Sequence, residues 1–248
     1  MNLFDLTGKK AIVTGTGSPR GLGRAMAQGL KEAGAEVLVI SRSPRVFDVA
    51  REDGFTALQV DLTNRSELNR GFKEAVEKLG TLDILINNHG MTFVNEATSF
   101  PMEVWDKMLE TNLTSVFQLC QLAGQIMIPK GYGKIINMAS MATFLGLTNI
   151  PSYIASKGAV GQLTKGLASE WASKGINVNA IAPGFIQTEM TEGLKKNPAR
   201  RDFFFSRISA GRWGDAADLK GVAIFLASHA SDYVHGTIIP VDGGYLAR

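Results

Sequence analysis

The chain has 248 residues, of which 45% are hydrophobic and 20% charged, a composition that suits one large α/β domain with a substantial core. Its formal net charge is +3, but the basic residues are scattered along the sequence. The chain lacks the basic stripe interleaved with aromatic residues that a nucleic-acid site needs. No run of about 18 apolar residues occurs, and the first ten residues lack a signal-peptide pattern. We therefore expect a cytoplasmic protein with no membrane or nucleic-acid partner.

The histidines and the cysteine give no support to a metal site. His89, His229 and His235 lie far apart and have no cysteine partner at metal-ligand spacing. Cys120 is the single cysteine and falls in an apolar helical stretch, where a small buried side chain is the expected interpretation. We predict no metal and no catalytic role for Cys120.

The first structural unit is a short apolar strand, expected at residues 9–14, followed by a helix from about 21 to 33. Between them lies the turn T-G-T-G-S-P-R-G-L-G, residues 14–23. Glycines at such a position let the backbone approach a pyrophosphate, which then rests on the N–H groups at the start of the helix. The pattern predicts the phosphate half of a dinucleotide site.

The second strand, expected at residues 36–41, ends where the adenosine ribose of such a cofactor would lie. An acidic residue at this position binds the ribose hydroxyls of NAD, whereas an arginine can receive the 2′-phosphate of NADP. The chain has Ser41, Arg42 and, slightly later, Arg45, and the glycine turn adds Arg20. A lone surface arginine is often only solvated, but together these residues favour NADP(H), with NAD(H) as the alternative.

The remaining elements continue the alternation of strand and helix. Strands are expected at 55–60, 82–86, 135–139, 176–181 and 237–241, and helices at 65–79, 103–128, 151–171 and 215–228. This order predicts a single α/β domain over residues 1–248, with a doubly wound, mostly parallel, seven-stranded sheet and helices on both faces. The segment 189–213 breaks the alternation and is interpreted as a substrate lid. Its phenylalanines, residues 203–205, can touch substrate, pack internally or meet another subunit.

Ligands of such a sheet bind at the carboxyl ends of the strands, where most of the polar motifs fall. The helix beginning at Pro151 carries Tyr153 and Lys157, four residues apart and so on one face. A nearby cation lowers the pKa of a phenol, and Ser140 can bind a substrate oxygen while Tyr153 exchanges its proton. The spacing alone is weak, because a solvated lysine beside an interfacial tyrosine would look the same.

Taken together, the motifs resemble those of the short-chain dehydrogenase/reductase family over essentially the whole chain. The resemblance rests on the glycine turn, Asp61, N-N-x-G at 87–90, Asn112, Ser140, Tyr153 with Lys157, and Pro183–Gly184 with Thr188. It implies a Rossmann-type fold and hydride transfer between a nicotinamide cofactor and a secondary alcohol or ketone. Tyr153 would be the acid/base, Lys157 would lower its pKa, Ser140 would position the reacting oxygen, and Asn112 would hold a water in a proton relay.

The resemblance also implies the cofactor site. Its residues would be Gly15, Gly17, Ser18, Arg20, Gly21, Leu22, Gly23, Ser41, Arg42, Asp61, Leu62, Asn88, His89, Gly90, Tyr153, Lys157, Pro183, Gly184, Ile186 and Thr188. Two departures stand out. Counting from Gly15, the glycine turn is two residues longer than usual, so either Gly15 or Gly17 makes the first turn. His89 replaces the usual alanine, and we interpret it as structural or substrate-lining rather than catalytic.

Within the family, the second half of the chain is similar to sugar-acid oxidoreductases of the gluconate 5-dehydrogenase and 2-dehydro-3-deoxygluconate dehydrogenase type. The stretches that carry this likeness are I-N-M-A-S-M, V-N-A-I-A-P-G, A-G-R-W-G and V-D-G-G-Y-L-A-R. They overlap with 3-oxoacyl-carrier-protein reductases, which remain an alternative, as does a non-catalytic cofactor-sensing regulator. The resemblance further implies a homotetramer, supported by apolar residues on two helices, namely Phe117, Leu119, Leu122, Leu163, Leu167 and Trp171.

Overall fold

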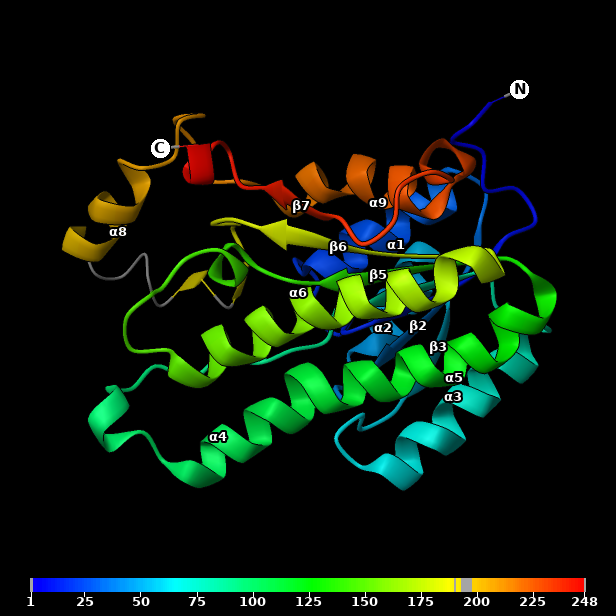
Figure 1. The fold of residues 1–248 in the computed structure, drawn as a ribbon, viewed down its shortest axis with the longest axis horizontal. Helices are drawn as coiled ribbons and strands as arrows, with labels where there is room; N and C mark the ends of the chain where they lie inside the picture. The colour runs from blue at the N-terminus through cyan, green and yellow to red at the C-terminus, as the bar shows by residue number, and fades with distance from the viewer. Residues whose placement is uncertain (1, 190, 193–197, 248) are drawn as a thin grey trace.

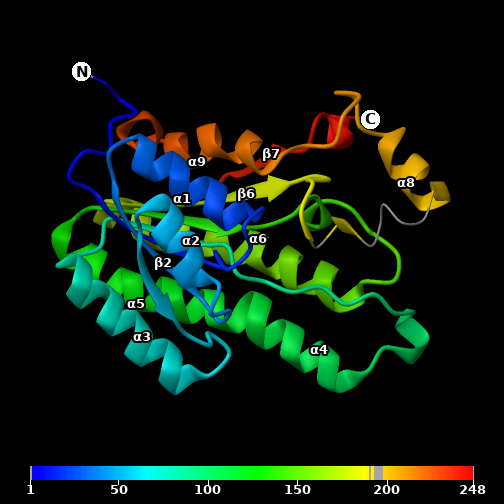
Figure 2. The same cartoon turned by 180° about the vertical axis from the view of Figure 1, so that it is seen from behind.

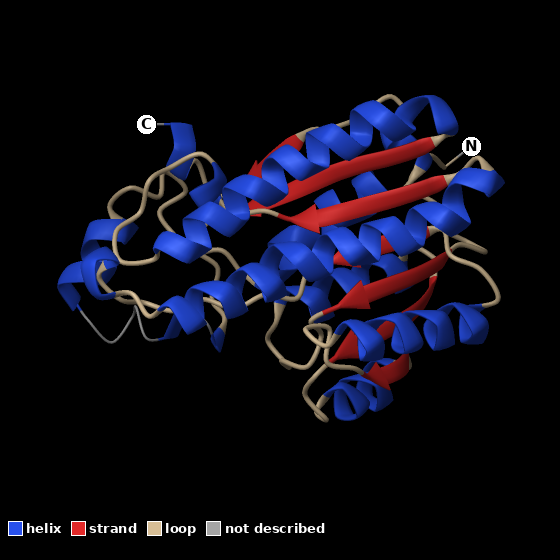
Figure 3. Ribbon diagram, turned by 60° about the horizontal axis from the view of Figure 1, so that its bottom comes forward, coloured by secondary structure: helices blue, strands red, loops and turns tan. Residues whose placement is uncertain are grey.

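The computed structural model describes residues 2–189, 191–192 and 198–247. Its strands are β1 (Lys10–Thr14), β2 (Glu36–Ser41), β3 (Thr56–Gln59), β4 (Ile84–Asn87), β5 (Gly133–Met138), β6 (Ile176–Pro183) and β7 (Ile238–Val241). Within the described residues these form one seven-stranded parallel sheet in the order β3-β2-β1-β4-β5-β6-β7 (Figure 3). The predicted fold class is confirmed.

Helices cover both faces of the sheet (Figures 1 and 2). The helices of the described residues are α1 (Leu22–Glu32), α2 (Val46–Asp53), α3 (Arg65–Leu79), α4 (Met102–Leu109), α5 (Ser115–Lys130), α6 (Pro151–Trp171), α8 (Pro198–Phe205) and α9 (Lys220–Ala227). One apolar core lies between the sheet and α3, α5 and α6, and a second lies between the sheet and α1, α2 and α9. Alternate residues of each strand supply the two cores, as Ile12 and Val13 do in β1.

Three helical predictions need correction. Helix α2 was not expected, because only three of its eight residues are buried and so short a stretch shows little periodicity. The helix expected at 103–128 is interrupted by a π-helical turn at Glu110–Thr114. The helix expected at 215–228 begins as a 3-10 turn, Ala216–Leu219, capped by Asp215. Within the described residues, no helix is both long and apolar enough to cross a membrane.

The carboxyl ends of the parallel strands lie at one edge of the sheet, as predicted. The chain moves outward from β1 to β3 on one side and from β4 to β7 on the other, so a crevice opens between β1 and β4. Helix α8 and the C-terminal residues lie beyond this edge, side by side in both views (Figures 1 and 2). Part of the expected lid, residue 190 and residues 193–197, lies outside the described residues.

Candidate active site

A cleft of ≈ 770 Å³ opens at the carboxyl edge of the sheet. Most of the predicted site residues line it: Gly15, Gly17, Ser18, Gly21, Leu22, Ser41, Arg42, Asp61, Leu62, Asn88, His89, Gly90, Ser140, Tyr153, Lys157, Pro183, Gly184, Ile186 and Thr188. The fold thus brings together motifs that lie more than 170 residues apart in the sequence. Arg20, Gly23 and Asn112 are not part of the lining.

The glycine turn is shaped by close backbone approaches. Gly15 has a φ of 72°, in the left-handed region, and a Cβ there would lie 2.7 Å from the backbone N and Cα of His89. A Cβ on Gly17 would lie 2.6 Å from Ser41 Oγ, so this glycine lets the turn pass the end of β2. A Cβ on Gly23 would lie 2.5 Å from Asn88 Nδ2, so Gly23 packs α1 against the turn after β4. Gly15 therefore makes the first turn, and Gly17 serves the approach to β2.

The turn fits a pyrophosphate. Helix α1 begins after Gly21, which provides no side-chain cap for its first N–H groups. Ser18 lines the cleft, and its Oγ is buried without a hydrogen-bond partner in the described part of the chain. A phosphate oxygen would satisfy both the free N–H groups and this hydroxyl.

Beside the end of β2, an arginine of the cleft lining is paired with an aspartate. Arg42 Nη1 lies 3.9 Å from Asp61 Oδ2, and the Arg42 side chain is 66% exposed. Asp61 Oδ1 accepts hydrogen bonds from Thr63 N (2.9 Å) and Thr63 Oγ1 (2.7 Å). Burial raises the pKa of Asp61, but these hydrogen bonds and the Arg42 charge outweigh it, and the net pKa is lowered. Arg45 also lines the cleft here.

Arg20 does not lie where the sequence placed it. Its guanidinium forms an ion pair with Glu192, and both side chains are exposed. The longer glycine turn carries Arg20 outward to a carboxylate that follows β6. In this structure Arg20 does not line the cleft, and its predicted role in binding the cofactor stays a prediction.

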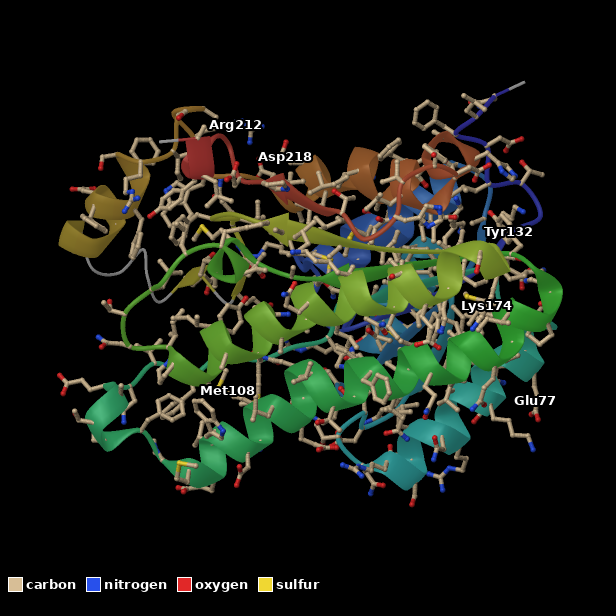
Figure 4. All side chains as sticks on the ribbon, in the orientation of Figure 1. Glu77, Met108, Tyr132, Lys174, Arg212 and Asp218 are labelled. Atoms are coloured by element: carbon tan, nitrogen blue, oxygen red, sulfur yellow. The ribbon has the colours of Figure 1, made fainter. Side chains whose placement is uncertain are left out.

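The expected catalytic side chains converge where β5 and α6 meet. Ser140 Oγ accepts a hydrogen bond from Ala142 N (3.1 Å), which leaves its own proton to be donated to Tyr153. Lys157 Nζ donates to the carbonyl of Met138 at 2.7 Å and lies 5.8 Å from the centroid of the Tyr153 ring. Burial lowers the pKa of Lys157 to about 8. Beside Tyr153, Ser152 Oγ contacts Met108 Sδ at 2.9 Å. Met108 lies between α4 and α6 in Figure 4.

The pKa of Tyr153 departs from expectation. Burial raises it above its ordinary value, and a hydrogen bond from Ser140 opposes the rise without reversing it. The predicted lowering by Lys157 is thus not seen in the protein alone, because desolvation of the phenolate outweighs other effects.

Asn112 is buried in the π-helical turn at 110–114. Its Oδ1 accepts from Met91 N (2.8 Å), and its Nδ2 donates to Met91 O (2.9 Å) and Ser156 Oγ (3.2 Å). The side chain therefore fixes the backbone after Gly90 and touches α6 between Tyr153 and Lys157. Its predicted role in a water relay stays a prediction.

The cleft lining also includes residues that the sequence did not single out. Met141, Leu147 and Ile150 line it from the loop between Ser140 and α6, and Phe185 lines it after β6. Both loops directly follow the carboxyl ends of predicted strands. That location in the sequence is the signal that could have identified these residues as part of the cleft. Phe204 of α8 packs on Phe185 with ring centroids 4.7 Å apart.

The structure also bears on the cysteine and on the side chains that could bind a metal ion. Cys120 is fully buried, and burial raises its thiol pKa to about 12, in agreement with a structural role. Among the described residues, no group of three or more His, Cys, Asp or Glu side chains could hold a metal ion.

The chain is similar over nearly its whole length to known oxidoreductases. A family profile described as "Enoyl-(Acyl carrier protein) reductase" matches residues 15–246. The chain belongs to the short-chain dehydrogenase/reductase family. It is 44% identical over 250 residues to the 2-dehydro-3-deoxy-D-gluconate 5-dehydrogenase of Bacillus subtilis (strain 168), covering 99% of this chain and 97% of that one.

Two further relatives support the assignment to the family. The gluconate 5-dehydrogenase of Gluconobacter oxydans (strain 621H) is 39% identical, with 98% of this chain and 96% of that one covered. A crystal structure of a gluconate 5-dehydrogenase from Burkholderia cenocepacia J2315, in complex with NADP and tartrate, is 38% identical. It superposes with a TM-score of 0.93 and covers 100% of this chain and 98% of that one.

Proposed function

We propose that this protein is a nicotinamide-dependent dehydrogenase that oxidises a secondary hydroxyl of a sugar acid, or reduces the corresponding ketone. The observation that carries the proposal is the convergence of Ser140, Tyr153 and Lys157 at the wall of the cleft that also holds the glycine turn. Full-length similarity to 2-dehydro-3-deoxy-D-gluconate 5-dehydrogenases supports the substrate class.

The side chains divide the chemistry between them. The nicotinamide, when bound, supplies the hydride donor or acceptor. Ser140 Oγ, held by Ala142 N, hydrogen-bonds the reacting oxygen, and Tyr153 removes or returns its proton. Because burial raises the pKa of Tyr153, its phenolate needs the positive charge of Lys157 nearby. Asp61, Arg42 and the glycine turn would hold the adenosine and phosphates.

A reductase of 3-oxoacyl thioesters is the competing enzyme function, and a non-catalytic cofactor sensor is the competing function of another class. A turnover panel decides among them: sugar acids, neutral polyols, steroids and 3-oxoacyl thioesters, each with NADP(H) and NAD(H). We expect the highest kcat/KM for a six-carbon sugar acid. A preference for an uncharged apolar substrate would contradict the proposal, and cofactor binding without any turnover would favour the sensor.

We infer that the cofactor is NADP(H). Arg42 and Arg45 both line the adenosine end of the cleft, and Ser41 leaves the end of β2 without a negative charge. A guanidinium suits the geometry of a 2′-phosphate. The B. cenocepacia relative, which binds NADP, has the same fold throughout its length.

A sugar acid also needs a cation for its carboxylate, and we propose Arg207. Arg201 is paired with Asp202, and Arg212 makes a bidentate pair with Asp218 at 2.7 and 2.9 Å, visible near β7 in Figure 4. The side chain of Arg200 lies outside what the structure describes. Arg207 has no carboxylate within 4.0 Å among the described residues.

The surroundings of Arg207 suit an acidic ligand. Its Cζ lies 4.9 Å from the centroid of the Tyr245 ring, and the buried Tyr245 hydroxyl has no hydrogen-bond partner in the described part of the chain. Tyr245 packs on Phe185 of the cleft wall with centroids 5.3 Å apart. Neither Arg207 nor Tyr245 lines the cleft itself, so the proposal requires the substrate carboxylate to pass Phe185 and reach the Arg207 guanidinium behind it.

Substitution of Arg207 tests this placement. Arg207→Gln should lower kcat/KM for the sugar acid by about 10- to 100-fold, as expected for a charge-assisted hydrogen bond. The kcat/KM of Arg207→Gln for the neutral polyol of the same chain length should equal that of the wild type. Arg201→Gln is the matched control, because its guanidinium is already paired with Asp202. Equal losses on acid and polyol would contradict the role of Arg207.

We further propose a homotetramer, because the resemblance to the family implies one. Part of the sequence argument for it, that apolar residues of two helices are exposed for association, is wrong. Leu119, Leu167 and Trp171 are buried inside the chain's own core and offer no free face. What supports association is the exposure of Phe117 on α5 and of Met102 on α4. A cytoplasmic location stays an expectation.

A further inference from the structure

His89 is the third residue of the N-N-H-G turn that follows β4, and it links two distant parts of the fold. Its Nδ1 lies 2.8 Å from Thr14 Oγ1 at the end of β1, and its Nε2 lies 2.7 Å from Ser115 Oγ at the start of α5. Both hydroxyl partners are fully buried. The residue itself is half-buried and lines the cleft.

The second of these contacts meets the π-helical turn at 110–114. Here the backbone N–H of Ser115 bonds to the carbonyl of Glu110, five residues earlier. The carbonyl of Thr111 therefore lacks the donor that an α-helix would give it. Ser115 Oγ supplies the replacement, donating to Thr111 O at 2.7 Å. One side-chain hydroxyl thus takes the place of a backbone donor in the π-turn.

The hydrogen-bond network assigns the state of the imidazole. Ser115 has one hydroxyl proton, and because that proton goes to Thr111 O, the Ser115 oxygen must accept from His89. Nε2 therefore carries hydrogen, and Nδ1 accepts from Thr14 Oγ1 at 2.8 Å, a shorter contact than the 3.3 Å from the same hydroxyl to Ile86 O. Burial, reinforced by the positive charge of Lys157, lowers the pKa of His89 to about 3, so the ring stays neutral under working conditions.

The same π-turn carries Asn112, which reaches the catalytic helix. Asn112 holds the backbone of Met91, two residues after His89, and donates to Ser156 between Tyr153 and Lys157. A Cβ on Gly90 would lie 3.3 Å from Asn112 Oδ1 and 3.8 Å from Lys157 Nζ, so the spacing here is close. A change in the π-turn would be felt at Lys157 and at the backbone that faces the cofactor.

We propose that His89 is a positioning residue: its Nε2–H orients Ser115 so that the π-turn keeps Asn112 and Met91 in register with α6 and the glycine turn. The inference rests on the proposed oxidoreductase function for its kinetic consequences, but not for its structural ones. His89 acts through Ser115 and takes no part in proton transfer.

Three substitutions separate the two ring nitrogens. Glutamine can place its amide N–H near the position of Nε2, asparagine places its amide near Nδ1, and alanine removes both. We expect kcat to fall about tenfold in His89→Ala and His89→Asn and to stay within about twofold of wild type in His89→Gln, the loss being that of one orienting hydrogen bond. The substrate KM should change little in all three.

Amide hydrogen exchange gives a readout that does not need turnover. The amides of residues 111–116 should exchange faster in His89→Ala and His89→Asn than in the wild type, and His89→Gln should restore their protection. Wild-type kcat and exchange in His89→Ala, or equal impairment by Gln and Ala, would overturn the proposal. A lower Tm in all variants with unchanged kcat and exchange would reduce His89 to packing and also overturn it. If the wild type turns over no substrate, the proposed function fails, and the exchange pattern alone decides for or against His89.

Discussion

Lys157 Nζ donates a 2.7 Å hydrogen bond to the carbonyl of Met138 and lies 5.8 Å from the centre of the Tyr153 ring. The ammonium is thereby fixed between the end of β5 and the phenol. Its burial costs stability, since the pKa falls from 10.5 to about 8. The position makes sense for a group that stabilises a phenolate.

This cost predicts that Lys157→Met is more stable than the wild type, although inactive. In the wild type without cofactor, the unfolded chain binds more protons than the folded one between pH 8 and 10.5, so the free energy of unfolding rises with pH in that window. Below about pH 8 the full penalty applies, and removing the charge should add roughly 2 kcal/mol at pH 7, the lost hydrogen bond to Met138 included.

Denaturant unfolding at pH 7 and pH 10 measures this effect. The difference in stability between the two pH values should shrink in Lys157→Met and persist in Lys165→Met, which removes an exposed lysine from the same helix. A destabilised Lys157→Met at pH 7 would contradict the account.

Arg42 should set the cofactor preference. Arg42→Ala should lower kcat/KM for NADP(H) by roughly ten- to a hundredfold, the worth of one charge-assisted contact, and change NAD(H) kinetics little. Arg51→Ala is a matched control, because Arg51 is an exposed arginine paired with Asp48 on α2. If both cofactors lose equally, or the wild type prefers NAD(H), then Arg42 is only a surface charge.

Arg20, by contrast, should matter little to the cofactor. Because it is exposed and paired with Glu192, Arg20→Ala should change kcat/KM for NADP(H) by less than about threefold, in keeping with the small worth of surface ion pairs. Steady-state kinetics of Arg20→Ala and Arg42→Ala in parallel provide the check. A loss with Arg20→Ala as large as that with Arg42→Ala would show that Arg20 leaves Glu192 to bind the cofactor.

Assembly can be measured directly. Light scattering at micromolar concentration should give about four times the chain mass of 26.7 kDa. Phe117→Lys, which charges an exposed position on α5, should shift the mass toward smaller species without unfolding the chain. A single 26.7 kDa species in the wild type would refute the homotetramer.

The strands and most helices could be predicted from sequence because they depend on local patterns, whereas most of the cleft-lining residues were implied by the resemblance to the family. An apolar run bounded by glycines places β1, and strand ends in a parallel sheet meet at one edge. The Tyr153–Lys157 spacing follows from the helix period alone. These features need no knowledge of distant partners.

What could not be predicted depends on contacts between distant residues. His89 bonds to Thr14 and Ser115, which are 75 and 26 positions away, and Arg20 bonds to Glu192 at a separation of 172. The π-turn at 110–114 was also missed, because the Ser115 hydroxyl that replaces one of its helical hydrogen bonds is itself in contact with the distant His89. The upward shift of the Tyr153 pKa was also not predicted, because the burial that causes it is a property of the folded chain.

The central claim is that Tyr153 is the acid/base of a dehydrogenase, and Tyr153→Phe tests it most directly. The variant should bind NADPH with a dissociation constant close to that of the wild type, measured by fluorescence titration, because Phe preserves the ring that packs at the cleft. Its kcat on the best sugar acid should fall by at least about 10²-fold, the usual worth of a lost general acid/base. Wild-type turnover in Tyr153→Phe would contradict the account.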